Sequence, residues 1–433
     1  MISILHRLRK RAFSPQKAKG ILFILLGLAM VGLFTFGVEP GQRATFGLNL
    51  GTSQAVPLPA LVPPVRPTIY VFSLIVAFVG VWQIARGFEY PKGHRRAKQW
   101  LPALGEWTGG VVILLCTFAF LTWSARGRSF NLTGMLRSSL QAATPIALAA
   151  LSGVWCERSA VINIGIEGML LTGAFVGVVV GSAVGILWLG LIAAILSGAI
   201  LGAVLAVLSI KFRVDQIISG TAINIFAVGL TSYLSAAWLA ENQKLNASGK
   251  FGLFALPLLS DIPILGPIFF NVNLLIYFMM ILIGVTHVVL FYTRWGLRTR
   301  AVGEHPLAAD TLGINVFRVR YVNVIIGGMI AGLGGAYFTL GSVGRFDEVM
   351  TAGRGFIGLA AMIFGQWSPL GAFASSIIFG FFDSLQVKLA LLNVPIPSHF
   401  LLMAPYLATI IAVTGVVGRT VPPAADGQPY EKQ

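Results

Sequence analysis

Long apolar stretches separated by short polar segments dominate the chain from residue 20 to residue 418. Most stretches reach about 20 residues, the length that a helix needs to cross roughly 30 Å of hydrocarbon. In lipid, helices and closed barrels alone satisfy all their backbone polar groups. The pattern predicts about twelve spans, at residues 20–38, 68–88, 108–125, 132–155, 160–182, 184–210, 217–240, 272–293, 321–343, a short one at 353–366, 370–391 and 400–418. The expected fold class is all-α, a polytopic transmembrane helical bundle.

Composition supports a membrane protein and excludes a nucleic-acid-binding one. Of 433 residues, 56% are hydrophobic and only 11% are charged, and the mean hydropathy is +0.83. A soluble domain would have about a quarter of its residues charged. The net charge of +16 comes from basic residues at the ends of apolar spans, where they fix orientation. We therefore expect the chain to meet a lipid bilayer and no nucleic acid.

Charge bias predicts that both termini are cytoplasmic. With the N-terminus inside, most basic residues fall on inner segments such as 86–98 and 294–320, as the positive-inside rule requires. The apolar run at 21–38 is longer than a signal-peptide core and has no Ala-x-Ala cleavage site, so we interpret it as a retained span. Three arginines fall on the outer side in this arrangement: Arg126, Arg128 and Arg137.

Small residues recur at helical spacing in three of the predicted spans. In lipid, such ridges let helix backbones approach closely, although glycine is also common in membrane helices generally. Three ridges together favour a tightly packed bundle. They are Gly173, Gly177 and Gly181; Gly198, Gly202 and Ala206; and Gly328 with Gly332.

Motifs for catalysis, metal binding or nucleotide binding are absent from the sequence. No lysine precedes Ser or Thr, so there is no P-loop. The five histidines show no metal-ligand spacing, and no Gly-x-Ser-x-Gly elbow occurs. Cys116 and Cys156 are too few for a disulfide framework or a metal cage. We expect no catalytic residue, no metal site and no cofactor bound by this chain.

Polar residues within the spans are the candidates for a solute path, because such residues usually face a bundle interior or a water-filled route. Asn163 and Glu167 lie four apart and would share a helix face. Gly165 and Gly168 could unwind the helix there. The alternative is that both polar side chains hydrogen-bond neighbouring helices.

A second set of polar residues lies in later spans. Thr221 and Asn224 would share a face in the same way, and Asp383 lies well inside the span 370–391. Neither Glu167 nor Asp383 has a charged partner at helical spacing, which argues against a proton relay. These residues predict a path for a polar, neutral solute, with helix-to-helix bonding as the alternative.

The stretch "AVGEHPLAADTLGI", residues 301–314, is short and polar between two long spans. Pro306 suits the first turn of a helix and Gly313 suits the left-handed position after its end. The helix between them would be about 12 Å long, too short to cross a membrane, and arginines flank it on both sides. Ala308 and Leu312 would form a small apolar face. We interpret this segment as a docking element for a partner.

Three segments resemble a known family. "GLRTRAVGEHPLAADTLGINVFRVR" resembles the cytoplasmic coupling segment of permease subunits of bacterial ABC importers, in the branch for ribose-type sugars, branched amino acids and nucleosides. "CERSAVINIGIEGMLLTGAF" and "GRGFIGLAAMIFGQWSPLGAFASSIIFGFFDSLQ" resemble the nucleoside or simple-sugar permeases that act beside basic-membrane-protein-type lipoproteins. The sugar-type pattern Gly-Ile-Asp-Leu-Ser is replaced by "NIGIEG", which favours nucleosides. The resemblance covers about residues 138–418.

The resemblance implies a multi-pass permease of the bacterial plasma membrane. Its implied partners are a separate ABC ATPase subunit that uses the ATP, a second permease subunit of different sequence, and an extracytoplasmic substrate-binding lipoprotein. The candidate path residues, taken from the polar positions within the spans, are Asn163, Glu167, Thr221, Asn224 and Asp383. The implied ATPase-coupling residues are Gly303, Glu304, Ala308, Ala309, Asp310, Leu312 and Gly313.

The expected organisation has three parts: an N-terminal extension of about three helices at 1–130, a permease core at 131–420 with the coupling helix at 301–315, and a cytoplasmic tail at 421–433. Shorter family members lack the extension. The alternative function is an ion-gradient-driven secondary transporter of a small polar solute. It would use inverted repeats with paired broken helices, and no convincing repeat relates the two halves. A structural scaffold, the third possibility, would need no coupling helix.

Overall fold

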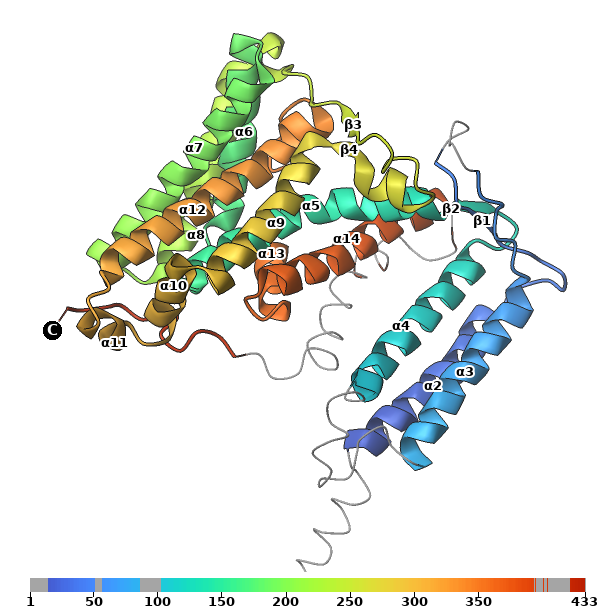
Figure 1. The fold of residues 1–433 in the computed structure, drawn as a ribbon. Coiled ribbons are helices and arrows are strands. Elements are labelled where there is room, and N and C mark those ends of the chain that lie inside the picture. The colour runs from blue at the N-terminus through green and yellow to red at the C-terminus, as the bar shows by residue number, and fades with distance from the viewer. Residues whose placement is uncertain are drawn as a thin grey trace, which may run out of the picture. The chain divides into compact units, whose positions relative to one another are not determined.

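The computed structural model describes residues 15–50, 57–85, 103–392, 394, 400, 403 and 421–432. The described residues are mostly helical (Figure 1). The chain divides into two compact units, one of residues 1–133 with 389–395, the other of residues 134–388 with 396–433.

Nine helices in the described ranges are long and apolar enough to cross a membrane: Lys17–Phe34, Val65–Ala85, Leu132–Glu157, Ile166–Val184, Leu187–Lys211, Gln216–Leu239, Leu274–Tyr292, Val316–Val343 and Pro369–Leu391. They confirm nine of the twelve predicted spans. Prediction 108–125 corresponds to the helix Ala103–Ser124, whose stretch Thr108–Ser124 is apolar but shorter than the nine spans. Prediction 353–366 is a helix of 11 residues, which covers only about 16 Å and is no span. Prediction 400–418 lies outside the described residues, apart from 400 and 403.

The first unit contains three helices and a pair of short strands. They are α2 (Pro15–Phe34), α3 (Val65–Ala85), α4 (Ala103–Ser124), β1 (Thr45–Gly47) and β2 (Ser129–Asn131). β1 and β2 pair in parallel, with Phe46 opposite Phe130. α2 and α3 are in close contact, since a Cβ on Gly80 would lie 2.7 Å from the carbonyl oxygen of Gly20.

The second unit contains most of the spans. Its helices are α5 (Leu132–Glu157), α6 (Ile166–Val184), α7 (Leu187–Ala206), α8 (Gln216–Leu234), α9 (Leu274–Tyr292), α10 (Arg294–Glu304), α11 (Pro306–Thr311), α12 (Val316–Ala336), α13 (Arg354–Phe364) and α14 (Pro369–Leu391). π-helical turns at Val207–Lys211, Ser235–Leu239 and Tyr337–Val343 extend α7, α8 and α12. Between α8 and α9, a 3-10 helix (Gln243–Asn246), a π-turn (Gly266–Phe270) and the antiparallel strands β3 (Leu253–Ala255) and β4 (Asn271–Asn273) form a structured loop.

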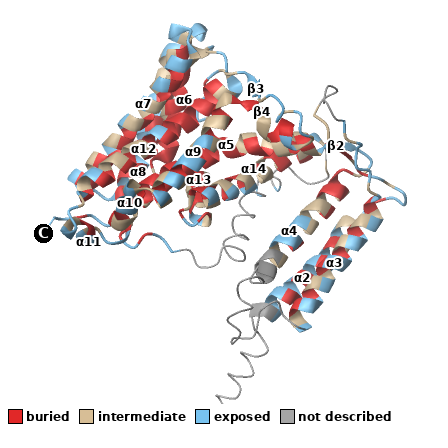
Figure 2. Ribbon diagram, viewed as in Figure 1, coloured by how far each residue is buried: buried red, intermediate tan, exposed pale blue. Residues whose placement is uncertain are grey.

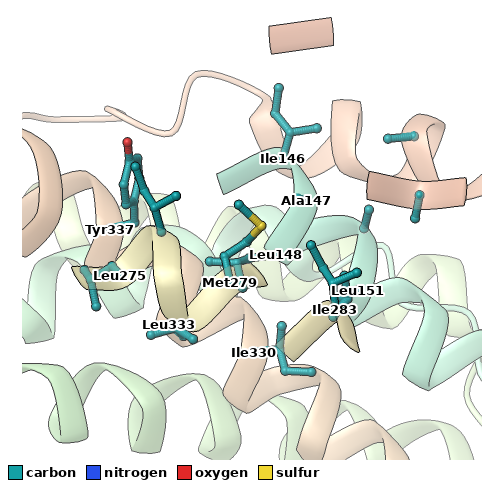
Figure 3. Close-up of a cluster of buried hydrophobic side chains, with 14 of the residues drawn as sticks. Ile146, Ala147, Leu148, Leu151, Leu275, Met279, Ile283, Ile330, Leu333 and Tyr337 are labelled. Carbon is teal, nitrogen blue, oxygen red and sulfur yellow. The ribbon is translucent and has the colours of Figure 1, made fainter. Parts of the chain in front are cut away.

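Burial separates the central helices of this unit from the peripheral ones (Figure 2). The spans that contain α5, α12 and α6 are 89%, 78% and 67% buried, whereas those that contain α8, α9 and α14 reach only 33–39%. Side chains of α5, α9 and α12 form the apolar core, with Leu151, Met279 and Ile330 among them (Figure 3). The peripheral helices therefore leave broad apolar faces for lipid or for partner subunits.

The predicted glycine ridges are confirmed as helix contacts. A Cβ on Gly173 of α6 would lie 2.6 Å from the carbonyl oxygen of Gly332 on α12. A Cβ on Gly198 of α7 would lie 2.2 Å from the carbonyl oxygen of Gly328, also on α12. Neither distance allows a side chain, so α6 and α7 meet α12 backbone to backbone.

Candidate functional site

A non-helical break at residues 158–165 separates α5 from α6. The predicted unwinding at Gly165 is confirmed, because α6 starts only at Ile166 and Ala160 has a φ of +64°. Gly168 is helical instead, and its missing side chain allows α8 to approach: a Cβ there would lie 2.9 Å from the carbonyl oxygen of Ile223. The predicted span 160–182 thus begins six residues late, and the difference is this break.

The carboxylate of Glu167 binds the N-terminus of α13. Its Oε1 accepts hydrogen bonds from the Thr351 hydroxyl at 2.6 Å and from the Gly353 amide at 2.8 Å, and its Oε2 accepts one from the Gly355 amide at 2.6 Å. Glu167 is only 7% exposed. A negative charge at a helix N-terminus satisfies its free amides and is favoured by the helix dipole. Glu167 is therefore a cap supplied by another helix.

Residues on both sides of the break hold α13 at its two ends. Beyond the C-terminal end of α13, the Arg158 guanidinium donates to the carbonyl oxygens of Trp367 at 2.9 Å and Gln366 at 3.2 Å. The Trp367 indole donates to Oε2 of Glu157 at 2.6 Å. Burial lowers the pKa of Arg158 from its usual value. With Glu167 at the other end, the break and α13 form one hydrogen-bonded assembly.

α8 bridges the break through two amide side chains. Asn224 accepts from the Gly168 amide at 2.8 Å and donates to the carbonyl oxygen of Ile164 at 2.9 Å. Gln216 accepts from the Ile162 amide at 2.6 Å. These bonds satisfy buried backbone groups that the non-helical break would otherwise leave unpaired.

Asn163 lies within the break and is fully buried. Its Nδ2 contacts the sulfur atoms of Cys156 at 3.5 Å and Met169 at 3.7 Å, and its Oδ1 has no hydrogen-bond partner among the described residues. Because Asn163 precedes the helix that carries Glu167, the predicted shared face of the two residues is wrong. The i, i+4 rule applies only within a continuous helix.

The other predicted path residues lie apart from this assembly. Thr221 is exposed and its hydroxyl donates to the carbonyl oxygen of Ile217 in its own helix, so it does not share the buried face of Asn224. Asp383 of α14 forms an ion pair with Arg354 of α13 at 3.2 Å, with both side chains about one-third exposed. The sequence shows Arg354 at the start of an apolar run, a signal that it needs a carboxylate partner.

A cavity of about 240 Å³ lies farther along α6 and α8. Its walls include the threonine Thr172, the aromatic residues Phe175 and Trp238, and several aliphatic residues. Thr172 is five residues beyond Glu167, and its hydroxyl has no hydrogen-bond partner within the described part of the chain. The cavity offers an apolar, aromatic surface beyond Glu167 along α6.

The predicted short helix is confirmed as α11, which begins at Pro306 and is followed by Gly313 at a φ of +79°. Leu312 is 80% exposed and Ala308 is exposed too, so the apolar face meets solvent. Ala309, at 2% exposure, faces inward instead.

Three further residues of the predicted coupling set differ in exposure. Glu304 is exposed and Asp310 is half-buried, whereas Gly303 is buried. A Cβ on Gly303 would lie 2.3 Å from the carbonyl oxygen of Arg158, so α10 touches the start of the break. Gly303 and Ala309 thus face the chain's own interior, and the surface open to a partner is formed by Ala308, Leu312 and their exposed neighbours.

Comparison with known proteins extends this picture. The profile of the family described as branched-chain amino acid transport system / permease component matches residues 135–414. The guanosine ABC transporter permease protein NupQ of Bacillus subtilis is 42% identical over 307 residues, which cover 68% of this chain and 95% of NupQ. The nucleoside ABC transporter permease protein NupC of Lactococcus lactis is 41% identical over 300 residues, which cover 67% of this chain and 94% of NupC.

A putative glucose ABC transporter permease protein, TsgC13 of Haloferax volcanii, is 35% identical over 305 residues, which cover 66% of this chain and 92% of TsgC13. No solved structure matches the chain. These matches oppose the alternative of an ion-gradient-driven secondary transporter. The chain therefore belongs to the family of branched-chain amino acid transport system permease components, and it is a multi-pass membrane permease of an ABC transporter.

Proposed function

We propose that this chain is the permease subunit of an ATP-driven importer of nucleosides. The main support for an uncharged cargo is the carboxylate of Glu167, which binds the N-terminus of α13. In transporters, the free N-termini of broken helices often bind anionic substrate groups. Here Glu167 already occupies that position, so the break offers no open anion site and suits an uncharged solute.

Two further observations support a nucleoside. The relatives NupQ and NupC are named as guanosine and nucleoside permeases and match over nearly their whole length. The cavity along α6 and α8 offers an apolar surface with aromatic residues, and a nucleoside carries an aromatic base. The cargo path in this proposal runs past Asn163, Glu167 and Asn224 to that cavity, and Thr221 and Asp383 are proposed to line it as well.

The same proposal assigns the partners. The exposed face of Ala308 and Leu312 docks on a separate ATPase subunit, which uses the ATP, while this chain binds no cofactor. A second permease subunit completes the path, and a lipoprotein delivers cargo from the outer side. Residues 1–130 form an extension to the permease core at 131–420.

This arrangement requires both termini and α10–α11 to be cytoplasmic, with the loop between α8 and α9 outside. Single cysteines at Arg298 and Asn246, both in a background without Cys116 and Cys156, test it with a membrane-impermeant thiol reagent. The Asn246 position should react in intact cells and the Arg298 position only after permeabilisation. Reaction of both from one side would refute this orientation.

Uptake by the reconstituted complex tests the function. Proteoliposomes with this chain, its partner permease, the ATPase and the binding lipoprotein should accumulate labelled guanosine when ATP is supplied to the ATPase side. An ion gradient without ATP should give no uptake. Excess unlabelled adenosine should compete and excess glucose should not. Competition by glucose alone would replace the nucleoside with a sugar, and gradient-driven uptake would refute the mechanism.

A further inference from the structure

Residues 421–432 lie along the α10–α11 segment and are held there by hydrogen bonds. The Ala425 amide donates to the carbonyl oxygen of Gly303 at 3.0 Å. The Ala424 amide donates to Oε2 of Glu304 at 3.3 Å. Pro423 and Ala425 are buried in this position. The end of α10 thus forms a pair of bonds with a segment that turns at residues 424–427 and follows more than a hundred residues later in the sequence.

The same segment is attached to α12 and to the loop after α7. Arg320, only 2% exposed, donates from Nη1 to the carbonyl oxygen of Gln428 at 3.0 Å. The rings of Tyr430 and Phe317 lie 5.2 Å apart, and Tyr430 packs in one apolar cluster with the buried Ala309 of α11. Glu431 forms an ion pair with Arg213. Tyr430 therefore supports α11 from behind, opposite its exposed face.

The segment also contacts the break that precedes α6. A Cβ on Gly427 would lie 2.8 Å from Cδ1 of Ile162, and Gly427 has a φ of +74°, where a side chain is strained. Ile162 is the residue whose amide is held by Gln216 of α8. Residues 421–432 thus contact both α11, the proposed docking helix, and the break before α6, which is hydrogen-bonded to α13.

Some buried polar groups between residues 421–432 and α12 lack hydrogen bonds within the part of the chain that the structure describes. Nε and Nη2 of the buried Arg320 and Oδ1 of Asp426 find no hydrogen-bond partner among the described residues. Buried polar groups without partners are costly, so this contact is weaker than one with every group paired. A segment held in this way can be displaced, in contrast to the fully paired Glu167.

From these contacts we propose that residues 421–432 form a strap that joins the α10–α11 segment to the break before α6, and that Gly427 and Tyr430 are positioning residues which transmit movement of α11 to α13. The strap rests on the proposed function, since it needs an ATPase that moves α11. The strap couples movement of α11 to movement of α13. It forms no part of the docking face of Ala308 and Leu312 or of the polar assembly at Glu167.

Two substitutions and two controls test the strap. Gly427→Val places a β-branched residue at a positive φ next to Ile162, and Tyr430→Ala removes the ring contact with Phe317. Pro429→Ala changes an exposed residue of the same segment, and Tyr430→Phe keeps the ring. In the purified chain, amide exchange of Ala425 should accelerate roughly tenfold in the first two variants, through backbone strain in Gly427→Val and through the lost ring contact in Tyr430→Ala, and stay unchanged in the controls.

The reconstituted complex supplies the second measurement. Gly427→Val and Tyr430→Ala should keep the ATPase bound and hydrolysing ATP, while guanosine uptake per ATP falls severalfold. Loss of the ATPase would mean that the segment belongs to the docking surface. Unchanged uptake per ATP would mean that the segment only shields the residues beneath it and transmits no movement. Either result, or unchanged Ala425 exchange in both variants, overturns the strap. Absence of ATP-driven guanosine uptake in the unsubstituted complex would instead refute the proposed cargo or mechanism.

Discussion

The break before α6 and the α10–α11 segment are both short interruptions between long apolar helices, but they differ in the burial of their side chains. In the break, Glu167 is buried and its two carboxylate oxygens accept three hydrogen bonds. In α10–α11, Leu312 is 80% exposed. The first interruption satisfies its polar groups within the chain, and the second presents apolar groups to its surroundings.

This difference indicates what each interruption requires. A buried break must pair its backbone and polar groups within the chain, because an unpaired buried polar group is costly. A helix outside the bundle can leave apolar side chains exposed, and an exposed apolar face is typical of a partner contact. Substitutions at Glu167 should therefore change the stability of this chain, and substitutions at Ala308 should change its assembly.

The largest effect is expected from Glu167→Ala. It removes the acceptor of three donors around α13, and breaking a buried charged network costs about 3–5 kcal/mol of stability. Thermal unfolding of the purified chain in detergent should show this loss, and transport should fall while bound ATPase remains. Glu167→Gln, which keeps one acceptor oxygen but turns an NH2 group toward the cap, should lose less. Normal stability with lost transport would make Glu167 a path residue and not a cap.

Ala308→Asp should act in the opposite manner. Docking on the ATPase would bury an unpaired charge, which costs several kcal/mol, so the ATPase should be lost on purification and uptake abolished. The unfolding temperature of the chain alone should not change, since Ala308 is exposed. Asp310→Asn and Lys244→Asp are the controls and should retain the ATPase. Normal ATPase binding by Ala308→Asp would remove α11 from the docking surface.

Substitutions in the Asp383–Arg354 ion pair should have a smaller effect than those at Glu167 and Ala308. Both side chains keep about one-third of their exposure, so their coupling energy should be about 1 kcal/mol or less. A double-mutant cycle of Asp383→Asn and Arg354→Gln, measured by unfolding of the detergent-solubilised chain, gives this energy. A coupling as large as that of the Glu167 cap would place the pair within the same rigid assembly.

The smallest effect concerns pH and the strap. Burial raises the pKa of Asp426 to about 6, and the neighbouring groups Glu157 and Arg320 partly oppose this. When the strap is detached, Asp426 should titrate near its ordinary pKa of about 4. The attached form therefore holds an extra proton between these values, so attachment is strongest below about pH 4 and weakens as pH rises through about 6.

Protection of the Ala425 amide, corrected for the intrinsic pH dependence of exchange, should accordingly decrease severalfold from pH 4 to pH 7. Asp426→Asn should reduce this dependence. Protection that increases with pH would mean instead that Asp426 holds the strap as a carboxylate.

Several features followed from the sequence alone. Apolar length predicted the spans, small residues at helical spacing predicted the contacts of α6 and α7 with α12, and Pro306 with Gly313 framed α11. All depend on local physics. The thickness of the bilayer sets the length of a span. One or two amino acids are enough to start a helix or to adopt a left-handed conformation, so these features do not depend on distant contacts.

The tertiary structure decided what the polar residues do. Glu167 caps α13, which starts 187 residues later in the chain, and Arg354 pairs with Asp383 of α14. Periodicity failed at Asn163 because the break ends the helix on which the i, i+4 rule depends. A cap supplied by another helix and an ion pair between helices arise from packing, and no local pattern specifies which distant donor a buried carboxylate will meet.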